Sequence, residues 1–184
     1  MLPFFTIGHS TRKLGDFTAL LRGVNVKLLV DVRSIPRSRT NAQYNRESLP
    51  HELAPLGIEY QHMAALGGLR ERQQTAIASL NTFWNNASFR NYADYTATDE
   101  FQGAFRTLRH LGHGSCCAIM CAEAVWWRCH RRIIADYLVT AGETVFHIMG
   151  RGRIEPARLT SAAHQMPNGV LVYPKSAHVP EPHQ

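Results

Sequence analysis

The chain has 184 residues, of which 45% are hydrophobic, and a formal net charge of +6. A chain of this length favours one domain, and this apolar fraction is enough to form a hydrophobic core. No window reaches the ~18 apolar residues of a membrane span, and the first ten residues lack the features of a secretory signal, so we expect a cytoplasmic protein without a membrane partner.

The signals for strands and helices alternate along the chain. Residues 4–7 are apolar and predict a short strand, Phe17, Leu20 and Leu21 follow at helical spacing, and residues 26–32 are rich in β-branched side chains. These segments predict a βαβ unit with two parallel strands. Further along, the sequence predicts a helix over 49–56, a strand over 58–63, a helix over 92–111, a strand over 115–120, a helix over 129–139, a strand over 144–149 and a short strand over 170–173.

This alternation predicts an α/β fold with three layers. We expect a mainly parallel, Rossmann-like sheet of about five strands, with helices on both faces. The fold should form a single domain over residues 1–184, with a core at about 3–160 and a loose tail at 175–184.

The four cysteines are confined to one stretch of the chain. They are Cys116, Cys117, Cys121 and Cys129. A framework of disulfides would spread its cysteines to join distant loops, so we expect reduced thiols instead.

Polar residues follow several of the predicted strands. Ligands of open parallel sheets bind outside the carboxyl ends of the strands, so these residues should meet at one edge. We therefore predict a cationic cleft that contains a thiol. Its residues come from His9 and Ser10, from Asp31, Arg33, Arg37 and Arg39, from Gly67, Gly68 and Arg70, from Cys121 and Glu123, and from Arg151 and Arg153.

Cys121 is the candidate nucleophile or redox group of this cleft. It precedes a predicted helix and lies near Arg128 and Arg131, and both features lower the pKa of a thiol. Glu123 or His9 would then act as the general acid or base. The negative charge of Glu123 opposes the other two features, because a carboxylate beside a thiolate raises the pKa of the thiol. Cys121 has two alternative interpretations. It could be a buried residue that packs as a small apolar group, or it could form a redox pair with Cys129. Without such a pair, we expect Cys129 to pack inward as a structural residue.

Cys121, Cys129 and His130 are residue types that bind metals. Their spacing matches no structural zinc pattern, in which paired ligands usually lie two to four residues apart. We therefore expect no metal here, and His130 would orient a neighbouring group or cap a turn. The sequence names no cofactor.

Asp31 and the arginines have plain structural interpretations as well. Asp31 and Arg33 would form a buried ion pair as readily as they would take part in catalysis, and the loop arginines would be solvated. The clustering of Arg33 and Arg39 with Ser38 nevertheless suits phosphate. We expect Cys121, Glu123, His9 and Asp31 to be catalytic, and the substrate-binding residues to be Arg33, Ser38, Arg39, Gly67, Gly68, Arg70, His130 and Arg131.

Four segments together resemble the family called domain of unknown function 488. They are residues 6–10, residues 29–33 with Pro36 and Ser38, residues 66–70, and residues 121–123 with 129–131. The likeness extends to about residue 150. It implies a compact α/β domain and supplies no roles for the motif residues.

The sequence favours a thiol-dependent enzyme that acts on an anionic substrate such as a nucleotide or a nucleic acid. The alternative is a binding domain without catalytic activity, in which the loop from Arg33 to Arg39 holds phosphate and the cysteines are structural. A third interpretation is a scaffold whose polar network only holds loops. The oligomeric state stays open.

Overall fold

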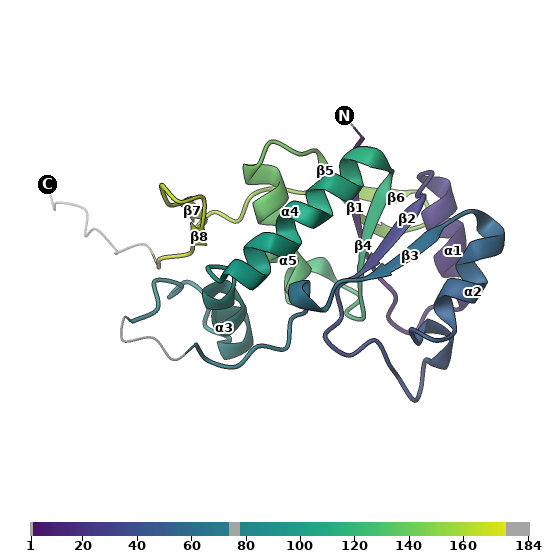
Figure 1. Cartoon of the computed structure of the whole chain (residues 1–184), viewed down its shortest axis with the longest axis horizontal. Coiled ribbons are helices and arrows are strands. Elements are labelled where there is room, and N and C mark those ends of the chain that lie inside the picture. The colour runs from purple at the N-terminus through teal and green to yellow at the C-terminus, as the bar shows by residue number, and fades with distance from the viewer. Residues whose placement is uncertain (1, 74–77, 176–184) are drawn as a thin grey trace, which may run out of the picture.

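A six-stranded sheet forms the centre of the protein in this computed structural model, which describes residues 2–73 and 78–175 (Figure 1). The strands follow one another across the sheet in the order β3-β2-β4-β1-β5-β6, and all pairs are parallel except β5 with β6. This confirms the mainly parallel α/β prediction. The strands are β1 Phe4–Gly8, β2 Leu28–Asp31, β3 Glu59–His62, β4 Cys117–Cys121, β5 Val145–Gly150 and β6 Arg153–Pro156.

Helices cover both faces of this sheet. One core joins β1, β2 and β4 to the helices α1 (Leu14–Gly23) and α2 (Leu49–Leu53). The other core joins the opposite face to α3 (Ala87–Tyr95), α4 (Asp99–Gly114) and α5 (Arg131–Thr140). The short elements are the 3-10 turns η1 Ala42–Tyr44, η2 Ala54–Leu56, η3 Ala64–Leu66 and η4 Trp126–Arg128, and a small hairpin of β7 His164–Gln165 with β8 Leu171–Val172.

Strand β4 shows how the alternation of side chains sets the direction of a functional group. Ala118 and Met120 face the core with α1 and α2, whereas Cys117, Ile119 and Cys121 face α3, α4 and α5. All five residues are buried. Cys121 is the last of them, so its thiol lies at the carboxyl end of the strand, on the side from which α5 approaches.

The single helix predicted over 92–111 is wrong, because the structure has two helices there. α3 ends at Tyr95 and α4 begins at Asp99. Thr98 caps α4, since its hydroxyl accepts a hydrogen bond from the Phe101 backbone N–H at 3.3 Å. The hydroxyl of Thr96 donates to the Ala93 carbonyl at 2.6 Å, which helps to end α3.

Strand β6 is the sixth strand and was not predicted. It follows β5 through a turn in which Gly152 has a φ of +67°, a conformation that favours glycine. The predicted tail at 175–184 lies outside the described residues apart from Lys175. Within the described ranges, no helix combines the length and the apolar character that a membrane crossing requires.

His147 on β5 is a histidine held inside the fold. Its side chain is 1% exposed, its Nδ1 lies 2.7 Å from the Thr6 hydroxyl, and its ring stacks on Trp126 at 4.4 Å between centroids. Burial lowers the pKa of His147 to about 4, and the nearby Arg131 charge acts in the same direction, whereas Glu155 opposes it.

This burial predicts a loss of stability in mild acid. Below pH 6.5, the ordinary value for histidine, the unfolded chain binds a proton that His147 in the folded protein does not accept until about pH 4. The free energy of unfolding should therefore fall by about 2 kcal/mol from this residue between pH 7 and pH 5. Urea unfolding across this range should show a shallower fall for His147→Gln, while the exposed control His51→Gln should follow the wild type. Equal slopes for wild type and His147→Gln would contradict the assignment.

Candidate functional site

A cavity of about 600 Å³ opens at the carboxyl edge of β1, β2 and β4. The register places Gly8 opposite Cys121 and Asp31 opposite Met120, so the three strands end at the same level. This is the edge at which the sequence predicted a cleft. The lining residues include Ser10 after β1, Arg33 and Ser34 after β2, Gly68 and Leu69 after η3, Cys121 and Glu123 from the end of β4, and Cys129 and His130 before α5.

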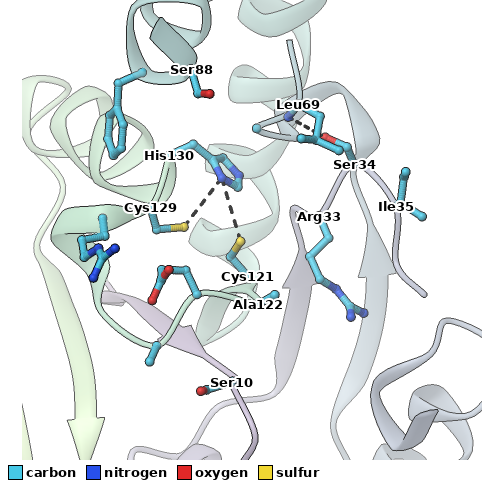
Figure 2. Close-up of a pocket in the computed structure, with 15 residues that line it drawn as sticks. Ser10, Arg33, Ser34, Ile35, Leu69, Ser88, Cys121, Ala122, Cys129 and His130 are labelled. Carbon is cyan, nitrogen blue, oxygen red and sulfur yellow. Dashed lines mark hydrogen bonds between the residues drawn. The ribbon is translucent and has the colours of Figure 1, made fainter. Parts of the chain in front are cut away.

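Two thiols and one imidazole meet at the wall of this cavity. Figure 2 shows both sulfur atoms pointing toward His130, whose Nδ1 lies 3.9 Å from the Cys121 Sγ and 3.6 Å from the Cys129 Sγ. The thiols are 8% and 3% exposed, respectively. The other ring nitrogen, Nε2, lies 3.1 Å from the Val32 carbonyl oxygen. A carbonyl oxygen only accepts hydrogen bonds, so Nε2 carries a proton, and in the neutral imidazole Nδ1 then presents a lone pair to the sulfurs.

The two thiols have opposite acidities. A hydrogen bond with Cys129, together with burial, raises the pKa of Cys121 to about 12. Burial alone would raise the pKa of Cys129, but the hydrogen bond from Cys121 and the charge of Arg131 outweigh it and lower the pKa to about 7. The sequence predicts the acidic thiol at Cys121 and a packing role for Cys129. The structure reverses these acidities, because Cys129 lies closer to the start of α5 and to Arg131.

Arg131 is a buried cation that anchors the loop between β4 and η4. It is 1% exposed, and it donates from Nη1 to the Glu123 carbonyl at 2.7 Å and from Nη2 to the Ala124 carbonyl at 3.0 Å. Among the residues that the structure describes, no carboxylate forms an ion pair with it. A nearby negative charge, such as a thiolate at Cys129, is therefore favoured.

Asp31 and Arg33 form the buried ion pair that was one interpretation of the sequence. Arg33 Nη2 donates to Asp31 Oδ2 at 2.6 Å, and Tyr60 donates its hydroxyl to the same oxygen at 2.7 Å. The carboxylate of Asp31 is fully buried and does not line the cavity, whereas Arg33 does. Asp31 thus holds Arg33 in place.

His9 joins this network from β1. Its Nδ1 donates to the Ser10 carbonyl at 2.8 Å, so Nε2 accepts from Arg33 Nη1 at 3.2 Å. The ring also stacks on Tyr44 at 4.2 Å between centroids. Burial lowers the pKa of His9 to about 4, and the Arg33 charge acts in the same direction. His9 lines an adjoining cavity of about 370 Å³ with Arg37, Ser38 and Asn41.

The remaining predicted residues divide between the cavity and its supports. Glu123 lines the cavity and accepts the Val125 N–H at 3.3 Å. Arg70 supports its own turn, because it donates to the carbonyls of Gly67 and Ala64, and its guanidinium lies 3.8 Å from the centre of the Tyr95 ring. Arg39 is exposed and lines neither cavity.

The two predicted glycines allow close contacts. A Cβ atom at Gly68 would overlap Nδ1 of His130, and one at Gly67 would overlap the Ser34 hydroxyl oxygen. That oxygen accepts the Leu69 N–H at 2.9 Å and so joins the loop after β2 to the loop after η3. Both glycines therefore let these loops approach the site.

Several lining residues were missing from the sequence-based set. Ile35 and Leu69 are 64% and 71% exposed and bring apolar side chains to the mouth. Their loops follow predicted strands, so the rule on strand ends could have found them. Ser88 and Phe89 come from α3, which begins in a stretch where the sequence has no clear hydrophobic periodicity. Arg128 is exposed and lines the cavity, whereas the sequence identified it only as a neighbour of Cys121.

Comparison with known families gives one match. Residues 13–138 match the family described as "Domain of unknown function DUF488". Comparisons with curated proteins and with solved structures give no match. The matched range covers most of the chain and includes Asp31, Arg33 and both site cysteines. Three of the four segments that resemble this family in the sequence lie within it, and residues 6–10 lie before it. The chain therefore belongs to the family of domain of unknown function DUF488.

Proposed function

We propose that this protein is a thiol-dependent enzyme that acts on a small anionic substrate in the cavity at the carboxyl edge of the sheet. The observation that carries the proposal is the convergence of Cys121, Cys129 and His130 on the wall of an open cavity. Structural cysteines usually pack as small apolar residues. Here two thiols instead lie against one imidazole nitrogen, and a fourth polar group, the Glu123 carboxylate, lines the same cavity.

The anionic character of the substrate is inferred from the groups around the thiols. The Arg128 guanidinium is exposed and lines the cavity, as do Arg33 and the hydroxyl-bearing Ser10, Ser34 and Ser88. Arginine and hydroxyl groups suit phosphate or carboxylate oxygens. The exposed Ile35 and Leu69 at the mouth suit an apolar part such as a base, so we propose a nucleotide-like substrate.

The loop arginines support a weaker alternative, which is nucleic-acid binding without catalysis. Arg37 and Arg39 are exposed, and Arg37 borders the adjoining cavity. Arg37 is, however, paired with Glu47 at 2.9 Å.

The four described cysteines are free thiols, which suits the proposed cytoplasmic setting.

Alkylation with two reagents tests the thiol and the anion site together. Iodoacetate is anionic and iodoacetamide is neutral, so a cation beside the thiols should make iodoacetate the faster reagent relative to a free thiol. An attraction of about 1 kcal/mol corresponds to roughly a fivefold preference. Peptide mass spectrometry of the reduced, metal-free protein should locate this preference at Cys121 or Cys129, and Arg128→Ala should remove it.

The controls separate a local effect from a general one. Arg22→Ala removes an exposed arginine in the last turn of α1 that does not line the cavity, and it should keep the preference. Cys117 is fully buried in β4 and should react slowly with either reagent. If the ratio of the iodoacetate rate to the iodoacetamide rate at Cys121 and Cys129 equals that of a free thiol, this would count against an anionic substrate. The enzymatic activity itself is tested by a screen of phosphate and carboxylate esters. The wild-type protein should turn over at least one of them, Cys129→Ser should lose this activity, and Cys116→Ser should keep it.

A further inference from the structure

Three soft or borderline donor atoms form a compact cluster at the cavity wall. Cys121 Sγ, Cys129 Sγ and one His130 nitrogen all lie within 4.8 Å of one another. The sequence spacing did not predict a metal site, because the eight-residue separation of the two cysteines matches no short zinc motif. In the structure, the loop anchored by Arg131 folds back and brings Cys129 next to the end of β4.

The imidazole of His130 is oriented as a metal ligand requires. Its Nε2–H donates to the Val32 carbonyl, which leaves the unprotonated Nδ1 directed at both sulfurs. Histidines that bind metals almost always donate their other ring N–H to a carboxylate, a carbonyl or a water molecule. Tyr92 packs edge-on against the ring at 5.0 Å between centroids, which further fixes its orientation.

The distances between the donors match those around a tetrahedral ion. Zinc lies about 2.3 Å from sulfur and about 2.0–2.1 Å from nitrogen, so tetrahedral angles place these two ligands about 3.6 Å apart. The sulfur-to-nitrogen distances here are 3.6 Å and 3.9 Å. A bound ion would therefore require only small shifts of side chains that are already in place.

The set of donors also selects the metal and the kind of site. Two thiolates and an imidazole favour zinc over magnesium or calcium, which prefer oxygen ligands. All three residues line the cavity, so a fourth ligand would come from water or substrate. Three protein ligands with an open fourth position are typical of catalytic zinc sites, whereas structural sites are closed by four.

We propose that Cys121, Cys129 and His130 bind one zinc ion with a fourth position open to the cavity. This inference rests on the proposed function for its catalytic meaning, and it specifies what the thiols do: they hold a Lewis acid rather than attack the substrate themselves. The zinc ion would polarise a water molecule or an oxygen of the anionic substrate bound beside it.

Cobalt is the probe for this site, because tetrahedral cobalt with thiolate ligands absorbs in both the near ultraviolet and the visible range. The reduced full-length protein, stripped with a chelator, should bind one equivalent of Co²⁺ with these bands, and Zn²⁺ should displace it. Cys121→Ser and Cys129→Ser should each weaken binding more than about 100-fold, because they remove a ligand. Cys116→Ser, at a half-buried thiol outside the cluster, should bind like the wild type.

Gly68→Ala provides a second variant that keeps all three ligands. Its Cβ would overlap Nδ1 of His130, so it should displace the imidazole and weaken cobalt binding about 10–100-fold in a folded protein. Circular dichroism should confirm the fold of each variant. The inference is overturned if no thiolate-to-cobalt band appears at one equivalent, or if the band persists in Cys129→Ser.

The two proposals fail in different ways. If cobalt does not bind but the iodoacetate preference is present, the zinc site is wrong and the proposed function stands. If cobalt binds with the expected bands but metal-free protein shows no iodoacetate preference, the zinc site stands and the anionic substrate is wrong. Zinc added before alkylation should protect Cys121 and Cys129 while leaving the rate at Cys116 unchanged, and failure to protect them counts against the zinc site.

Discussion

Replacing Asp31 with alanine should lower the free energy of unfolding by about 3–5 kcal/mol. The substitution leaves the Arg33 guanidinium, which is 6% exposed, without its counterion in the interior. It also removes the acceptor of the Tyr60 hydroxyl and of the Arg33 backbone N–H. Breaking one partner of a buried pair is costly because the remaining charge stays desolvated.

Urea unfolding followed by circular dichroism measures this loss, and the chain contains a suitable control. Glu47 pairs with Arg37 at the surface, where the side chains are 62% and 71% exposed. Glu47→Ala should therefore change the free energy of unfolding by less than about 1 kcal/mol. A loss below about 1 kcal/mol for Asp31→Ala would show that the buried pair does not support the edge of the sheet.

Replacing Gly8 with alanine should destabilise the protein by about 3 kcal/mol or more. A Cβ atom at this position would overlap the carbonyl oxygen of Glu123, and the atoms it meets belong to the backbone rather than to a flexible side chain. The same carbonyl accepts the Nη1–H of Arg131 at 2.7 Å. The loop must therefore move away from β1, and the contact that anchors it to α5 must weaken.

Thermal unfolding of Gly8→Ala should be compared with that of Gly15→Ala. Gly15 lies in α1, and a Cβ atom there would meet nothing within 4 Å. Gly15→Ala should leave the stability unchanged or raise it by up to about 1 kcal/mol, because alanine loses less backbone entropy in a helix. If both variants unfold alike, the close contact between β1 and the loop is not required.

The sequence predicted the elements whose hydrophobic pattern is strong. Each predicted strand overlaps a strand of the structure, and Phe17 in α1 and Phe101 in α4 are buried where the helical period placed them. The missed break between Tyr95 and Asp99 depends on the capping group of Thr98, which a periodic pattern does not reveal. Strand β6 was missed because it has only four residues, three of them exposed, and ends in a proline, which argues against a strand.

The candidate site shows the same limits. The rule on strand ends correctly brought His9, Arg33 and Cys121 to one edge, because it depends only on the direction of the strands. It could not show that Asp31 neutralises Arg33, or that Arg70 is engaged by backbone carbonyls. The sequence left the meeting of Cys121 with Cys129 as one alternative, because it depends on how the loop between them folds back onto Arg131.

The position of β4 between β1 and β2 has a consequence for how the protein folds. Strands β1 and β2 are close in sequence, yet both pair with β4, whose first residue is Cys117. In a chain leaving the ribosome, β1 therefore has no partner strand, and β2 has only β3, until more than half of the sequence has been synthesised. Such non-local pairing is slow to form, and exposed edges invite association between chains. The strand that carries Cys121 thus joins β1 to the β2–β3 pair, and the other edge of β1 is covered only when β5 follows.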